Sequence, residues 1–103
     1  MQKVIRDGKV AVLYSPGYGA GWFTWNVPIE GVFHPDLVEA VERKASSTEI
    51  EEIAKRLFGD DNYYGGADQL RIKWIPIGTQ FRIEEYDGSE SIYIQSDYTF
   101  ITV

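Results

Sequence analysis

The chain has 103 residues, 44% of them hydrophobic and 25% charged, which predicts one globular domain over residues 1–103 and excludes an intrinsically disordered chain. It has no cysteine, so disulfides, thiolate metal sites and cysteine nucleophiles are excluded. The net charge is −6, the basic residues form no cluster, and no apolar run is long enough for a signal core or a membrane span, so we expect a soluble, cytoplasmic protein that binds neither nucleic acid directly nor a membrane.

Two strands are predicted at the start of the chain, over residues 2–5 and 9–14. An Asp-Gly pair joins them, and this pair is a strong short-range signal for a hairpin turn. The second strand, KVAVLY, is almost continuously apolar, which predicts a central position in a sheet. Residues 15–33 are predicted to be irregular, because glycine and proline interrupt them repeatedly.

Two helices are predicted in the middle of the chain, over residues 34–44 and 48–59. Pro35 suits the first turn of the first helix, where a backbone N–H is not needed. Thr48 and Glu51 have the spacing of a capping box at the start of the second helix, and a glycine ends it. The predicted buried stripe of the second helix is Ile50, Ile53, Ala54 and Leu57.

A polar loop over residues 60–68 leads into strands predicted over 70–75, 81–86 and 91–95, and a last strand over 99–103 is left open. A second Asp-Gly pair marks the turn before the strand at 91–95. The order β-β-α-α-β-β-β, with or without the last strand, predicts an α+β fold. We expect a mostly antiparallel sheet with the two central helices packed on one face or end.

The most unusual segment is SPGYGAGWFTWN, residues 15–26, which we call the glycine-rich loop. Glycine permits φ > 0 and close approach to the backbone, and large aromatic rings carry much contact area. We therefore predict an outward-facing contact surface here, with a second patch at the Tyr-Tyr pair of the 60–68 loop. A wide turn that tucks its rings into the core is the commoner alternative. The candidate binding residues are Gly17, Tyr18, Gly19, Gly21, Trp22, Phe23, Trp25, Tyr63 and Tyr64.

The alternating glycines follow a predicted strand, where a phosphate-binding loop would lie. Their spacing is not that of a dinucleotide-binding fingerprint, and the Gly-Lys-Ser/Thr of a P-loop is absent. A nest of backbone N–H groups could still hold a phosphate while a ring stacks on the base and Arg71 or Lys73 adds charge. Binding of a nucleotide or cyclic nucleotide is therefore the alternative function.

No metal site, cofactor or catalytic residue is predicted. The 60–68 loop resembles a calcium loop in part, but Arg71 stands where a bidentate glutamate is needed. The only histidine, His34, is best explained as part of a helix start. Four carboxylates flank the second hairpin turn and predict a solvated acidic edge suited to a basic partner, with a carboxylate-based enzyme as a third hypothesis. They are Glu84, Glu85, Asp87 and Glu90.

The runs KVAVLYSPGYGAGWFTWN, FHPDLVEAVE and IKWIPIGTQFRIEEYDGSESI, with the GG-containing loop between the last two, resemble a group of short bacteriophage and prophage proteins that usually have no assigned function. The resemblance covers most of the chain. It implies a phage origin, a place in the host cytoplasm, and a role directed at the host, such as inhibiting a host or defence protein or capturing a nucleotide signal. We thus predict a non-catalytic binding protein with a protein partner; the 15% aromatic content leaves self-association open.

Overall fold

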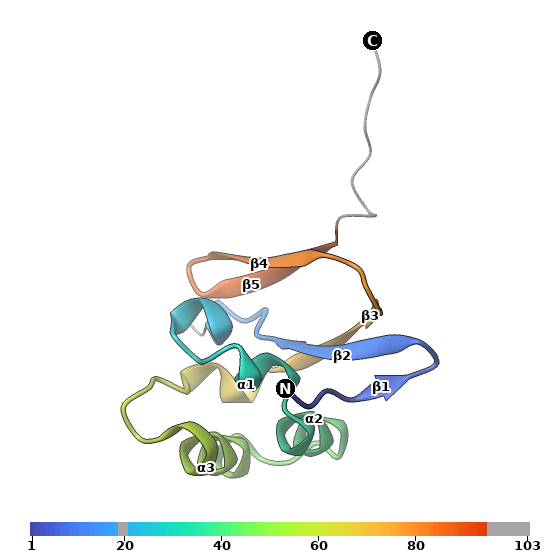
Figure 1. Ribbon diagram of the computed structural model, residues 1–103. Coiled ribbons are helices and arrows are strands. Elements are labelled where there is room, and N and C mark those ends of the chain that lie inside the picture. Colours follow the sequence, from blue (N-terminus) through green and yellow to red (C-terminus); the bar gives the residue numbers. More distant parts are fainter. Residues whose placement is uncertain (19–20, 95–103) are drawn as a thin grey trace.

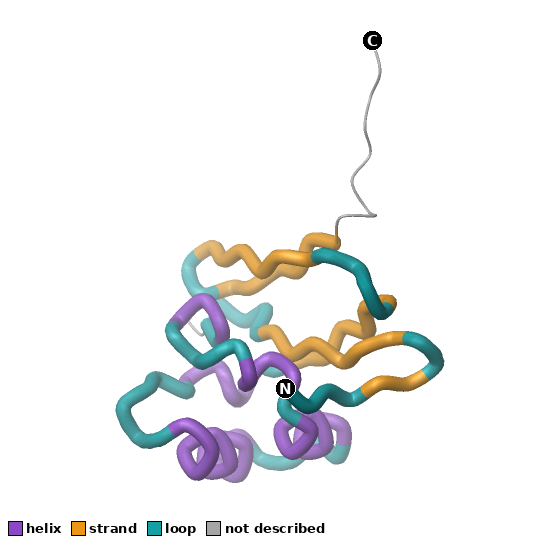
Figure 2. The backbone as a smooth tube through the Cα atoms, in the orientation of Figure 1, coloured by secondary structure: helices purple, strands orange, loops and turns teal. Residues whose placement is uncertain are grey.

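Residues 1–18 and 21–94 are described by a computed structural model, in which they form three layers (Figure 1). A three-stranded sheet lies in the middle. The helices α2 (Pro35–Glu42) and α3 (Ser47–Phe58) cover one of its faces, and a separate two-stranded hairpin covers the other (Figure 2). The predicted α+β class, with antiparallel strands and helices on one face, is confirmed.

The central sheet has the order β1-β2-β3 and is antiparallel throughout. Its strands are β1 (Ile5–Arg6), β2 (Lys9–Tyr14) and β3 (Arg71–Pro76). As predicted, the apolar KVAVLY strand lies between two neighbours. In the turn before it, Asp7 has φ 52° and Gly8 has φ 75°, so both central residues are left-handed, as a tight type I′ hairpin requires.

Both faces of β2 are buried, which explains why its sequence is nearly all apolar. Ala11 and Leu13 point into the helix-side core, which we define by Leu37, Val38, Ile50 and Ile53 of the two helices. Val10 and Val12 point the other way, into the hairpin-side core, which we define by Phe33, Ile75 and Ile94.

The separate hairpin consists of β4 (Phe81–Tyr86) and β5 (Ser89–Ile94), and residues 71–76 and 81–86 are strands as predicted to within one residue. The strand expected over 91–95 begins two residues earlier than predicted. The strand left open over 99–103 lies outside the described residues. What the sequence did not indicate is that β4 and β5 leave the first sheet and fold over it, which packs the half-buried Ile83 and Ile92 against the hairpin-side core.

The helices differ from prediction mainly at their ends. A short helix, α1 (Glu30–Phe33), precedes α2 and was not predicted. The predicted helix over 34–44 ends at Glu42, because Lys44 takes a left-handed φ of 58°. The Thr48 cap is wrong: Ser46 caps α3, and its Oγ accepts a hydrogen bond from the N–H of Glu49 at 3.2 Å.

Two short 3-10 helices lie in the loops, η1 (Phe23–Trp25) in the glycine-rich loop and η2 (Gly65–Gln69) before β3. The predicted stripe of the second helix is confirmed, with Ile50, Ile53 and Ala54 buried and Leu57 half-buried. No helix within the described ranges combines the length and the apolar character that crossing a bilayer requires.

Candidate binding surfaces of the glycine-rich loop

Glu90 lies buried beneath the glycine-rich loop, with 1% of its surface exposed. Its Oε1 accepts a hydrogen bond from the Ser15 N–H at 2.8 Å. Its Oε2 accepts from the Trp22 N–H at 3.0 Å, from the Thr24 N–H at 2.8 Å and from the Thr24 hydroxyl at 2.7 Å. The backbone N–H of Glu90 also donates to the Ser15 carbonyl at 2.7 Å. One carboxylate therefore fastens both ends of the loop to β5.

The prediction of a solvated acidic edge is wrong for Glu90. In β5 the inward positions are Glu90, Ile92 and Ile94, so the strand's own alternation directs Glu90 toward the interior. A buried carboxylate needs several donors, and the backbone of the loop supplies them. The signal was present in the sequence, because Glu90 stands two residues before an isoleucine that was already predicted to point inward.

The same hydrogen bonds bear on the nucleotide alternative. The glycine-rich loop does form a nest of N–H groups, but those of Ser15, Trp22 and Thr24 already hold an anion, the protein's own Glu90 carboxylate. A phosphate at these three donors would have to displace it. The structure therefore supplies no observation that favours nucleotide binding at this place.

Trp22 and Tyr64 form an aromatic pair inside the protein, with ring centroids 5.9 Å apart. They are 0% and 2% exposed, so the expectation that they face outward is wrong. Each ring has a partner for its polar atom: the indole N–H donates to the Gly31 carbonyl at 3.0 Å, and the Tyr64 hydroxyl donates to the Gly59 carbonyl at 2.8 Å. With these bonds made, burying both rings leaves no indole or hydroxyl donor unsatisfied.

A second aromatic pair joins the same two loops on the outside. Trp25 and Tyr63 lie with ring centroids 5.5 Å apart and ring planes inclined at 36°. Trp25 is half-buried and Tyr63 is 52% exposed. With Thr24 and Asn26 they line an open hollow of about 350 Å³, and we call these four residues the aromatic surface. One aromatic residue from each of the two separately predicted patches, Trp25 and Tyr63, therefore meets on this surface.

Two glycines allow these outer rings to lie where they do. A Cβ added at Gly21 would overlap the Trp25 indole, and one added at Gly65 would overlap the Tyr63 phenol. Gly17 similarly makes room for the Gln69 side chain. None of the three has a left-handed φ. These glycines are needed because a neighbouring side chain lies close to their backbone. The freedom to adopt φ > 0, which was also expected of Gly17 and Gly21, is not needed at these positions.

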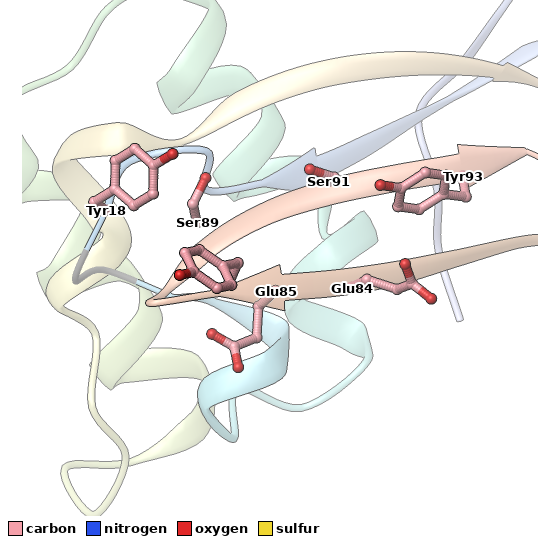
Figure 3. A pocket seen from close by; sticks show the side chains of 7 residues that line it. Tyr18, Glu84, Glu85, Ser89, Ser91 and Tyr93 are labelled. Carbon is pink, nitrogen blue, oxygen red and sulfur yellow. The ribbon is translucent and has the colours of Figure 1, made fainter.

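The remaining candidates are divided between core, surface and the undescribed part of the chain. Phe23 is half-buried and packs against the hairpin-side core. Gly19 lies outside the described residues. Tyr18 is 77% exposed and stands beside β5, close to Ser89 (Figure 3). Sequence reasoning did not select Tyr86 and Tyr93, which are 73% and 42% exposed on the same hairpin.

The other titratable residues considered from the sequence, His34, Glu84 and Glu85, make hydrogen bonds or ion pairs within the fold. His34 caps α2, and its Nδ1 accepts from the Asp36 N–H at 3.1 Å. Glu84 pairs with Arg82 at 3.1 Å, and Glu85 accepts from the Gly88 N–H at 2.8 Å. Within residues 1–18 and 21–94, no three His, Asp or Glu side chains gather as a metal site would require.

Comparison of the chain with protein-family models, with curated proteins and with solved structures gives no match in any of the three.

Proposed function

We propose that this chain is a non-catalytic binding protein that recognises another protein through the aromatic surface. The observation that carries the proposal is the Trp25–Tyr63 pair at 5.5 Å, formed at the surface by two loops that are far apart in the sequence. Tryptophan and tyrosine are the residues most enriched among interface hot spots, where they fill pockets on a partner.

The position of the pair favours recognition over core packing. The fold already joins the same two loops through the buried Trp22–Tyr64 pair, and Glu90 fastens the glycine-rich loop to β5, so an outer pair is not needed to hold them. Tyr63 keeps 52% of its surface exposed. Since Gly21 and Gly65 let the rings lie close to the backbone, the rings are held before a partner arrives, which lowers the entropy lost on binding.

The resemblance to phage and prophage proteins supplies the class of partner to test first, a host or defence protein. Wild-type protein, Trp25→Ala and Tyr63→Ala are immobilised and exposed to host lysate. Ile77→Ala is the matched control, because Ile77 is 58% exposed and lies outside the aromatic surface. We expect one protein to be retained by the wild type and by the control, and to fall at least about tenfold with each aromatic variant, which is about 1.4 kcal/mol of binding free energy.

Thermal unfolding of the same proteins separates binding from folding. Because Trp25 and Tyr63 are only partly buried, each alanine variant should lose no more than about 1 kcal/mol of stability. The proposal is refuted if Trp25→Ala and Tyr63→Ala retain every captured protein as well as the wild type does. A loss of about 3 kcal/mol or more in both variants would instead assign the rings to the core.

A further inference from the structure

We infer that the outer face of the β4–β5 hairpin, together with Tyr18, is a second docking surface that takes an extended, arginine-rich segment of a partner protein. We call its residues the tyrosine face: Tyr18, Tyr86, Tyr93, Glu84 and Glu85, which with Ser89 and Ser91 line a hollow of about 250 Å³ (Figure 3). The inference extends the proposed function to different residues and does not rest on the aromatic surface.

The strand register assembles this face. On the outer side of the hairpin, Arg82 stands opposite Tyr93, Glu84 opposite Ser91, and Tyr86 opposite Ser89. Glu85 stands opposite the inward-pointing Glu90 in the register, but it is exposed next to the turn and also lines the hollow. Tyr18 joins them from the glycine-rich loop. The Ser89 hydroxyl donates to the carbonyl of Pro16 at 2.6 Å, which holds the loop against the end of β5.

The core does not require rings on this side. The inward residues of the hairpin, Phe81, Ile83, Ile92 and Ile94, already pack on the hairpin-side core. Tyr18 and Tyr86 nevertheless remain 77% and 73% exposed and line the same hollow. A single exposed ring needs no explanation, but rings gathered in one hollow are typical of an interaction surface.

The charge of the face selects a basic partner. Glu84 and Glu85 both line the hollow, and only Glu84 is ion-paired with Arg82 among the described residues; the chain as a whole carries a net charge of −6. Phosphates would be repelled here, as would a second copy of this acidic chain. A guanidinium, by contrast, stacks on tyrosine and pairs with a carboxylate at the same time.

One end of the face already holds a guanidinium in this way. The Arg82 guanidinium carbon lies 5.7 Å from the Tyr93 ring centroid, and its Nε lies 3.1 Å from the Glu84 carboxylate. At the other end, Tyr18 and Tyr86 supply rings and Glu85 supplies a carboxylate, one oxygen of which also accepts from the Gly88 N–H. The cation–π pairs found among the described residues do not include Tyr18 or Tyr86.

An extended partner segment can present several arginines to the face at once. Alternate side chains of a strand point to one side about 6.6–6.8 Å apart, so arginines at every second position would all face the hairpin. The probe is therefore a fluorescent peptide of about nine residues with alternating arginine and serine, long enough to lie along strands of typical length. Its control carries citrulline in place of arginine, which keeps the shape and removes the charge.

Fluorescence anisotropy with the full chain measures the affinity. We expect saturable binding of the arginine peptide, weakening at least about tenfold for the citrulline peptide and falling as salt rises from about 50 to 300 mM. Tyr18→Ala, Tyr86→Ala and Glu85→Gln should each weaken it at least about fivefold. Ile77→Ala is the matched control, since Ile77 is also a large exposed side chain (58%) but lines neither the hollow of the tyrosine face nor that of the aromatic surface, and the variant should bind as the wild type does.

A second measurement needs no variant: in the wild-type protein, the peptide should shift the backbone amide NMR signals of β4 and β5 and leave those of α2 and α3 unchanged. Absence of saturable binding, equal affinity for the citrulline peptide, or an equal loss with Ile77→Ala each overturns the inference. None of these results affects the outcome of the lysate experiment with Trp25→Ala, so either proposal can be refuted without the other.

Discussion

Replacing Glu90 with glutamine tests whether one buried carboxylate holds the glycine-rich loop in place. The substitution keeps the size of the side chain but turns one acceptor oxygen into an NH₂ donor. If the remaining oxygen faces the N–H groups of Trp22 and Thr24, the NH₂ faces the Ser15 N–H at the place where Oε1 accepted it. If the amide flips, the NH₂ faces the Trp22 and Thr24 donors instead. Either orientation places donor against donor.

The size of the effect follows from the hydrogen bonds that glutamine cannot make. A hydrogen bond to a charged group contributes about 1.5–3 kcal/mol, against about 0.5–1.5 kcal/mol for a neutral one. Glu90 accepts four such bonds. Glutamine removes at least one and weakens the others, so we expect a loss of about 3 kcal/mol, out of a total stability of about 5–15 kcal/mol. That corresponds to a fall of about 12–24 °C in Tm for a chain of this length.

Urea unfolding followed by tryptophan fluorescence measures this loss, because Trp22 is 0% exposed and bonds directly to Glu90. Glu84→Gln is the matched control on the same hairpin. Its side chain is 50% exposed and its only described ion pair is with Arg82, so it should change stability by no more than about 0.5 kcal/mol. A Glu90→Gln loss as small as that of the control would refute the reasoning.

Glu90→Ala adds an independent test of the nest. It removes all four bonds and leaves space for a small anion where the carboxylate lay. Acetate or formate should therefore raise the Tm of Glu90→Ala more than chloride does at the same ionic strength, and should not do so for the wild type. Equal effects of the three salts on the variant would show that the loop donors do not form an anion site once Glu90 is removed.

Three further outcomes are expected. Gly21→Ala forces the Trp25 indole to move and should cost about 1–3 kcal/mol in urea unfolding; an unchanged midpoint would show that the ring is free to shift. Trp22→Phe removes a buried indole and its hydrogen bond and should cost about 2–4 kcal/mol, whereas Trp25→Phe should cost less than about 1 kcal/mol; similar costs would contradict the inside-outside division of the two rings. A hydrogen bond from Arg43 lowers the pKa of Glu49, so this pair stabilises the fold above the ordinary pKa of glutamate and the contribution is lost as pH falls through the lowered value. At low salt, the Tm of Arg43→Gln should fall less steeply at acidic pH than the Tm of the wild type. The same dependence of Tm on pH in both proteins would show that the pair does not contribute to stability.

The features that sequence reasoning predicted correctly are those set by neighbours along the chain. Both Asp-Gly pairs form turns with positive φ at Asp7, Gly8, Asp87 and Gly88, because those residue types tolerate that conformation wherever they stand. The stripe of α3 and the central position of β2 follow from periodicity and from an unbroken apolar run.

At the candidate site, the predictions that failed concern the direction in which side chains point. Trp22 and Trp25 are three residues apart in one loop, and nothing in their local sequence distinguishes the ring that is buried from the ring that is exposed. The difference comes from Gly31, whose carbonyl accepts the Trp22 N–H, and from Tyr63, which meets Trp25 outside. Both partners belong to other segments, so their positions depend on the folded chain.

The sequence by itself determined the two long helices, the strands from β2 to β5 and the Asp-Gly turns to within a few residues, because backbone preference and hydrophobic period act over a few residues; it did not indicate the short helix α1, and the strand predicted over 2–5 is only Ile5–Arg6. Only the tertiary structure decided that the second hairpin folds over the first sheet and that Glu90 fastens the loop between them. The physical reason is that a buried carboxylate is stable only where donors from distant residues converge on it, and that convergence exists only after the layers have packed.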